Sequence, residues 1–238
     1  MTMSNRILIV MPTRGRPGRL VEAVASIFNN SSGKADILIC YDDDDVTRMD
    51  PYPIPVVLQP YFHVMTVVGP RRSFVEWVNI GVMAHVNDYD WVAWGADDVV
   101  FKTPEWDQLV LGVKVPGAVA YGRDGIHNRN WPTHPFVDAV IPRALGYLIH
   151  PALKHYYADN WLADVSQHLN SAVYLEELFT EHNHPTMAKC KTDQPYDEAM
   201  ASWWERDKKA YSDVVCGYAQ PAARAVLAYI SRNERRAV

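Results

Sequence analysis

Three short apolar segments, each running into a polar cluster, constrain the fold of this chain more than any other feature. They are residues 7–11, 36–41 and 91–94. Continuous apolar runs of this length are typical of strands buried on both faces of a parallel sheet. Segments with helical spacing lie between them, and this alternation indicates a Rossmann-like sheet. The sequence therefore predicts an α/β fold with a mostly parallel sheet flanked by helices.

The remaining periodic segments extend this pattern to the end of the chain. Helical spacing marks residues 20–28, 72–86, 159–169, 196–209 and 221–235. Further strands are expected at residues 56–58, 63–68 and 118–122, the first two as a strand and a hairpin-like return. Residues 123–135 are polar, aromatic and without a period, and a loop of that length inside a domain is usually functional. No repeat or low-complexity linker interrupts the chain, so a single domain is expected over residues 1–238.

Composition excludes several classes of protein. The 238 residues are 48% hydrophobic and 21% charged, which is typical of a globular domain and not of a disordered chain. A net charge of -5 disfavours nucleic acid as the main partner. The three cysteines form no disulfide or metal pattern, and the apolar run of residues 7–11 is too short for a signal peptide or a membrane span. We therefore expect a cytoplasmic protein without a membrane span.

The pair Asp97 and Asp98 is the strongest chemical signal. Both follow the strand at residues 91–94, and ligands of such sheets gather at the carboxyl ends of the strands. Adjacent carboxylates supply the hard oxygen ligands that Mg²⁺ and Mn²⁺ prefer. A cation there would neutralise a diphosphate leaving group. The alternative is a solvated turn with Asp98 near the start of a helix.

Two other polar clusters are expected at the same edge of the sheet. After the first strand, Pro12, Thr13 and Arg14 place a hydroxyl and a cation where a nucleoside or its phosphates could bind, although no Walker or dinucleotide glycine pattern is present. Arg16 and Arg19 are interpreted as exposed. After the second strand, four aspartates follow Tyr41; Asp42 or Asp43 is suited to hydrogen bonding with a ribose or base, and the others are expected to be solvated.

These motifs together resemble the family-2 glycosyltransferases, which have the GT-A fold. The resemblance covers about the first 125 residues and rests on the Pro-Thr-Arg turn, the acid-tipped second strand, the helix within residues 71–85 and the sequence Ala96-Asp97-Asp98. It implies that Arg72 and Asn79 contact the donor, that Asp97 contacts the ribose and that Asp98 holds the metal. The first acid of a full Asp-x-Asp motif is replaced by Ala96. Loosely, the chain also looks like small stand-alone transferases of phages and bacteria.

The resemblance also gives roles to residues of the second half. A carboxylate at the head of a helix serves inverting members of the family as general base, and Asp159 occupies such a position, with Asp164 as the second candidate. The alternative for Asp159 is a helix N-cap, and a retaining enzyme would not need it as a base. One late histidine often completes the metal shell of GT-A enzymes, so His184, or else His182, would join Asp98.

Three further features of the second half are open to two interpretations. Lys189 could reach the diphosphate, as could the neighbouring Lys191, or both could be exposed lysines. Trp131 is a candidate for the acceptor site, because sugars have apolar faces that pack on aromatic rings. The pair Trp203 and Trp204 lies in a helical segment and is expected to belong to the core.

The sequence thus predicts a glycosyltransferase that depends on Mn²⁺ or Mg²⁺ and transfers a sugar from a nucleoside-diphosphate donor to an acceptor hydroxyl, with inversion. Residues 1–120 would bind the nucleotide sugar and residues 121–238 the acceptor. The acceptor would be a glycan, a protein or a small molecule, with a modified DNA base ranked below these. The alternatives are a sugar nucleotidyltransferase and a non-catalytic nucleotide- or carbohydrate-binding module.

Overall fold

The centre of the fold is a group of parallel strands that follow the apolar runs of the sequence. The structure is a computed structural model that describes residues 5–50, 63–183 and 192–237. Strand β1 (Ile7–Thr13) lies between β2 (Ala35–Asp42) and β4 (Trp91–Trp94), and β3 (Val64–Gly69) pairs with the far side of β2, all in parallel. Every residue of β2 and β4 is buried, as expected for strands covered on both faces.

Four shorter strands complete an eight-stranded sheet with the order β3-β2-β1-β4-β7-β6-β8-β5. They are β5 (Val99–Phe101), β6 (Val119–Arg123), β7 (Phe136–Asp138) and β8 (Ala172–His182). Strand β7 runs antiparallel between β4 and β6, whereas β8 pairs in parallel with β6 and antiparallel with β5. The expected α/β fold with a mostly parallel, Rossmann-like sheet is confirmed.

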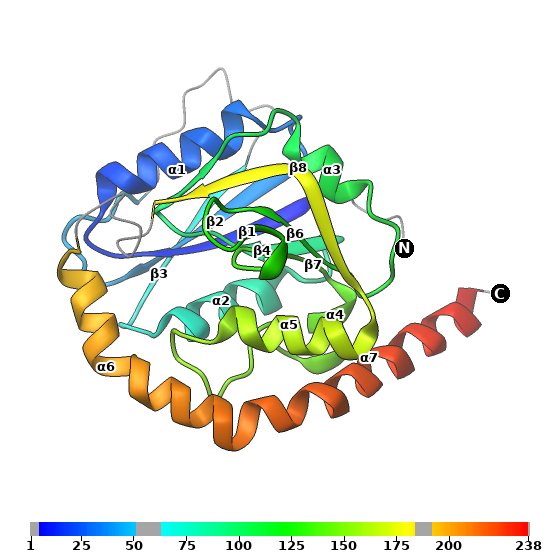
Figure 1. Cartoon of the computed structure of the whole chain (residues 1–238). Helices are drawn as coiled ribbons and strands as arrows, with labels where there is room; N and C mark the ends of the chain where they lie inside the picture. The colour runs from blue at the N-terminus through cyan, green and yellow to red at the C-terminus, as the bar shows by residue number, and fades with distance from the viewer. Residues whose placement is uncertain (1–4, 51–62, 184–191, 238) are drawn as a thin grey trace.

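Helices cover both faces of the sheet (Figure 1). One face carries α1 (Pro17–Asn29) and α3 (Trp106–Leu111) over a buried apolar cluster. The other carries α2 (Phe74–His85), α4 (Val140–Leu145), α5 (Ala158–Leu169) and α7 (Cys216–Ala237). Helix α2 approaches β1 closely, because a Cβ atom added at Gly81 would meet Val10 Cγ1 at 2.7 Å. Ser73 and Glu76 form a capping box that begins α2.

The C-terminal region is a long helical run, not two separate helices. Helix α6 (Gln194–Ala210) passes through a π-helical turn (Tyr211–Val215) directly into α7. The prediction that the last helix starts at Pro221 is wrong, since this proline lies inside α7. Ala219, Ala222 and Val226 are buried on both sides of it, and their packing stabilises a helix that proline alone would interrupt.

Other elements differ from the sequence-based expectations. Helices α3 and α4 and strands β5, β7 and β8 were not predicted, and after the end of β6 at Arg123 residues 124–135 contain only a short 3₁₀ turn (Asn128–Asn130). The strand expected at residues 56–58 lies outside the described residues. Strand β3 follows it and pairs in parallel with β2. Within the described ranges, no helix has both the length and the apolar character needed to cross a bilayer.

Candidate active site

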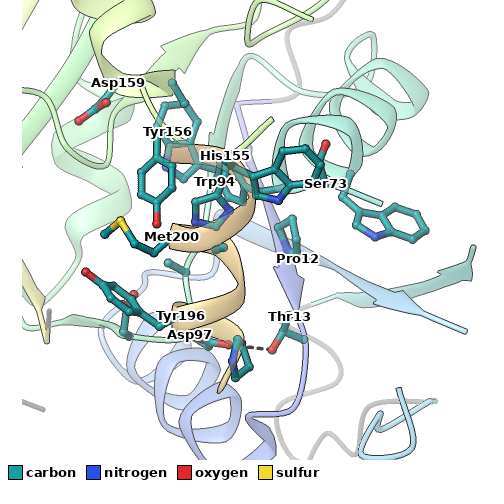
Figure 2. A pocket seen from close by; sticks show the side chains of 18 of the residues that line it. Pro12, Thr13, Ser73, Trp94, Asp97, His155, Tyr156, Asp159, Tyr196 and Met200 are labelled. Atoms are coloured by element: carbon teal, nitrogen blue, oxygen red, sulfur yellow. Dashed lines mark hydrogen bonds between the residues drawn. The ribbon is translucent and has the colours of Figure 1, made fainter. Parts of the chain in front are cut away.

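A cleft of about 1530 Å³ opens at the carboxyl ends of β1, β2 and β4. Its walls come from distant parts of the chain: the turn after β1, the start of α2, the turn after β4, residues 126–134, residues 155–160 and helix α6. Figure 2 shows Thr13 and Asp97 joined at one end of this cleft, with His155 and Tyr156 farther along it. This is the edge of the sheet at which the sequence placed its three polar clusters.

Asp97 is buried and held by two donors. Thr13 Oγ1 donates to it at 2.9 Å and Arg16 Nη1 at 3.0 Å. Burial raises the pKa of Asp97, and the charge of Arg16 works against this shift. The negative charge of the adjacent Asp98 raises the pKa of Asp97 further. The Asp97 carboxylate thus accepts hydrogen bonds from two residues of the turn after β1, which fix its position.

Asp98 lines the cleft and has the opposite electrostatic character. Burial alone would raise its pKa, but the nearby imidazole of His182 and the charges of His134 and Arg16 lower it to about 2. The His182 Nε2 atom lies 3.6 Å from Asp98 Oδ2. The ring of His134 meets that of His182 edge-on, with centroids 4.6 Å apart. Asp98 therefore carries a negative charge at any physiological pH beside two imidazoles.

Strand β8 is the element that brings His182 to this position. Its antiparallel pairing with β5 sets His182 opposite Val99, the residue that follows Asp98. The chain on both sides is fixed by backbone hydrogen bonds, from His182 N to Asp124 O at 3.0 Å and from Asn183 N to Asp98 O at 2.8 Å. The other predicted histidine, His184, and the lysines Lys189 and Lys191 lie outside the described residues. Among the residues that the structure describes, no three His, Cys, Asp or Glu side chains converge as a complete metal site.

The aspartates after β2 have separate roles. Asp42 is buried and accepts hydrogen bonds from Trp77 Nε1 at 2.8 Å and from the backbone N of Arg72 at 3.1 Å. Asp43 is exposed and is not among the residues that line the cleft. The expectation that Asp45 is solvated is wrong, because it is buried and accepts a hydrogen bond from Gly15 N at 3.1 Å. This bond attaches the loop after β2 to the turn after β1.

Arg14 and Arg16, in the turn after β1, form ion pairs with aspartates of other segments. Arg14 pairs with Asp42 at 3.2 Å and with Asp44, whose side chain is half exposed. Arg16 was interpreted as an exposed arginine, which is wrong: only 18% of its side chain is accessible. It bridges Asp97 and Asp193, the N-cap of α6, with Nε 2.8 Å from Asp193 Oδ2. Burial lowers the pKa of Arg16, but the hydrogen bond to Asp193 and the charge of Asp97 raise it well above its ordinary value.

Asp159 lies in the first turn of α5 and lines the cleft. Tyr157 is the N-cap of that helix, so the alternative role of Asp159 as N-cap is not seen. Burial raises the pKa of Asp159, while hydrogen bonds from Asn160 N and from Trp131 Nε1, both at 2.9 Å, oppose the shift. Asp164 does not line the cleft and accepts a hydrogen bond from the Tyr211 hydroxyl. Figure 2 shows Asp159 well apart from Asp97 along the cleft.

Two of the remaining predicted residues line the cleft and a third, Asn79, does not. Pro12 and Arg72 line the cleft, and the Arg72 guanidinium lies 5.5 Å from the centre of the Trp77 ring. Asn79 does not line it; its side-chain oxygen accepts from Leu148 N and Ile149 N, both at 2.9 Å.

Three tryptophans of the second half, Trp131, Trp203 and Trp204, reach the cleft. Trp131 lines it, as the acceptor-site interpretation requires. Trp203 and Trp204 were expected in the core, but they line the cleft as well, because the apolar face of α6 looks into it. Trp204 is 38% exposed. The sequence of α6 does carry a signal: polar and charged residues surround the two tryptophans, as is typical of an exposed helix and not of a core helix.

Comparison with known proteins finds similar folds among solved structures. No protein-family model and no curated protein sequence matches the chain. A solved structure of the mannosyltransferase PcManGT from Pyrobaculum calidifontis, in complex with GDP-Man and Mn²⁺, is similar with a TM-score of 0.55 and 11% identity, over 95% of this chain and 75% of that one. S. aureus TarS 1–349 in complex with UDP is similar with a TM-score of 0.54 and 9% identity, over 73% of this chain and 60% of that one. At these identities the likeness establishes a GT-A-like fold.

Proposed function

We propose that the chain is a metal-dependent glycosyltransferase that moves a sugar from a nucleoside-diphosphate donor to an acceptor hydroxyl with inversion. The observation that carries the proposal is the position of Asp98. This ionised carboxylate lines a cleft at the carboxyl ends of the parallel strands, beside His182 and on the same rim as Thr13 and Asp42. The shared fold with a mannosyltransferase in complex with GDP-Man and Mn²⁺ supports this assignment.

The nucleoside of the donor is assigned to the wall between β1 and α2. Asp42 is buried there among polar donors, and Pro12 and Thr13 line the same wall. Asp97 accepts hydrogen bonds from ribose hydroxyls in this proposal. The guanidinium groups of Arg14 and Arg72 face the diphosphate, for which planar cations are good partners. Asp43 and Asn79, which lie outside the cleft lining, are left out of the donor site.

The residues present fit a divalent cation. Asp98 supplies an ionised oxygen ligand, and His182 supplies an imidazole nitrogen close by. The remaining ligands would be oxygens of the diphosphate, or residues outside the described ranges, where His184 and Lys189 stay candidates for metal and diphosphate binding. When bound, the cation neutralises the charge that develops on the leaving diphosphate.

Asp159 is proposed as the general base. Its carboxylate takes the proton of the acceptor hydroxyl while that oxygen attacks the anomeric carbon, and the bond from that carbon to the phosphate oxygen breaks with its electron pair going to the diphosphate. Burial raises the pKa of Asp159, which makes its carboxylate a stronger base, and the Trp131 N–H holds one carboxylate oxygen.

A melting-temperature panel of nucleoside diphosphates, with and without Mn²⁺, tests the proposal. At a ligand concentration of 100 Kd, binding to the native state contributes about 2.7 kcal/mol, which corresponds to a rise of roughly 5–11 °C for a chain of this size. We expect one diphosphate to give this rise only with Mn²⁺, and Asp98→Asn to lose it. Glu176→Gln, at a carboxylate with 80% of its side chain exposed, is the matched control and should keep it. A panel without a metal-dependent rise, or pyrophosphate release from a nucleoside triphosphate and a sugar phosphate, contradicts the proposal.

A further inference from the structure

Helix α6 is attached to the rest of the protein largely by polar side chains, and none of its apolar side chains is fully buried. Among the residues of this helix, Asp207 alone is buried. The other attachments include ion pairs of the N-cap Asp193 with Arg16 and of Glu198 with Arg71, the latter at 2.7 Å. They also include a hydrogen bond from Arg206 Nη1 to Ala152 O at 3.0 Å and contacts of the Trp204 ring with Tyr156 and Tyr157. A helix on a protein surface is normally stabilised by burying an apolar stripe. The apolar stripe of α6 is instead open to the cleft.

That open stripe is aromatic and lies opposite a second aromatic wall. Tyr196, Met200, Trp203 and Trp204 line the cleft from α6, and Phe74, Trp94, His155 and Tyr156 line it from the other side. Figure 2 shows Tyr196 and Met200 on α6 beside the same cavity as Trp94, His155 and Tyr156. Trp204 meets Tyr156 edge-on, with ring centroids 5.1 Å apart, where the two walls join.

Buried hydrogen bonds hold the second wall in place. Asp207 accepts from the backbone N atoms of Lys154, His155 and Tyr156, at 3.1, 2.7 and 3.0 Å. The rings of Phe74 and His155 are in contact, with centroids 5.5 Å apart. Because three amides of one segment share a buried carboxylate, the rings that they carry are preorganised before any ligand binds.

The size of the cleft leaves room for a ligand in this compartment in addition to a donor. A single small-molecule pocket occupies about 300–1,000 Å³, and this cleft has about 1530 Å³. Two ion pairs lie at the aromatic walls: Lys154 is paired with Glu76 at 2.7 Å, and Arg71 with Glu198. Among the described residues of these two walls, the charged side chains that line the compartment, Arg71, Glu76 and Glu198, are thus already paired.

The chemistry of the two walls matches a sugar ring. Tyrosine, tryptophan and histidine combine an apolar face with a polar edge, as a sugar combines C–H faces with hydroxyl groups. A lipid chain would not use these polar edges. Two ring pairs here meet at steep angles, 88° for Phe74 with Trp94 and 85° for Tyr156 with Trp204, whereas the rings of Tyr157 and Trp204 are inclined by 33°. A nucleobase is therefore the competing ligand in the test below.

From this arrangement we propose that the compartment between α6 and residues 154–157 is the acceptor subsite and binds a neutral sugar ring, with Tyr156 as a stacking surface. The inference rests on the proposed function and names its acceptor class. It assigns to α6 the task of closing one side of that subsite.

Saturation-transfer NMR of the full chain with methyl glycosides of glucose, galactose, mannose and N-acetylglucosamine tests the inference. With Mg²⁺ and the diphosphate that raises the melting temperature, we expect saturation of the sugar C–H protons. Tyr156→Ala and Trp204→Ala should each weaken the signal by roughly fivefold, a typical loss for an aromatic contact, whereas Tyr156→Phe should keep it. Tyr218→Ala, at a 54% exposed tyrosine outside the cleft, is the control and should leave it unchanged.

The outcomes separate this inference from the proposed function. No sugar saturation alongside an intact diphosphate-dependent rise in melting temperature overturns the sugar subsite alone. Sugar saturation without any such rise removes the acceptor role and the transferase together. Equal signals from Tyr156→Ala and the unaltered chain, or stronger saturation of thymidine or of the alkyl chain of octyl glucoside than of the sugar rings, also overturn the subsite.

Discussion

Asp207 is the residue whose removal should reveal most clearly how the cleft is held in shape. It is completely buried, and its carboxylate accepts hydrogen bonds from the backbone N atoms of residues 154, 155 and 156 and from Arg206 Nη1 at 2.6 Å. Asp207→Ala leaves these three amides without their acceptor. Each buried donor left unsatisfied costs about 1–3 kcal/mol.

The total is therefore roughly 3–9 kcal/mol, and water entering the space left by the carboxylate brings the expectation to the lower part of that range, about 3–5 kcal/mol. This is a large share of the stability of a typical domain, about 5–15 kcal/mol. Asp207→Asn keeps one acceptor oxygen and should lose less than Asp207→Ala. Urea unfolding followed by tryptophan fluorescence measures both losses.

Glu205→Ala is the matched control, because this carboxylate is exposed two residues away on the same helix. It should change the free energy of unfolding by less than about 0.5 kcal/mol. A loss below about 1 kcal/mol for Asp207→Ala would refute the reasoning, since it would mean that the amides of residues 154–156 do not depend on this carboxylate.

Two further predictions concern the proposed base Asp159 and a close helix contact. Burial raises the pKa of Asp159 in the folded state, so its contribution to stability is greatest below the unfolded-state pKa and is lost as the pH rises through the folded-state pKa. Asp159→Asn should therefore raise the melting temperature at pH 7 while abolishing sugar transfer. A lower melting temperature of this variant would contradict the prediction. Gly81→Ala should destabilise by about 1–3 kcal/mol, because the new Cβ atom would meet Val10 Cγ1 at 2.7 Å and Leu38 Cδ2 at 3.0 Å; Gly18→Ala, with nothing within 4 Å of the added atom, should not, and equal melting temperatures of the two variants would count against the close packing of α2 on β1.

The parallel half of the fold was predictable because its signals are local. The apolar runs that became β1, β2 and β4 are buried on both faces, and no polar residue interrupts β1 or β4 before its rim. Since parallel strands end at one edge, the convergence of Thr13, Asp42 and Asp97 followed from the strand order alone.

The parts that sequence reasoning missed depend on contacts between distant residues. Strand β8 has two adjacent exposed glutamates at 176 and 177, so its alternation is weak, and only its register with β5 brings His182 to Asp98. Arg16 was interpreted as exposed because its partner Asp193 is 177 residues away. Trp203 and Trp204 were assigned to the core on the assumption that an apolar helix face is packed, whereas here it faces a cleft.

The most direct test of the account is the position of a bound cation. Crystals grown with Mn²⁺ and the nucleoside diphosphate identified in the melting panel would locate the metal by its anomalous scattering. The account predicts one peak within coordination distance of the Asp98 carboxylate, in contact with the diphosphate, and no peak there in Asp98→Asn. A bound diphosphate with the metal held elsewhere, or with Asp98 turned away from it, would contradict the central claim.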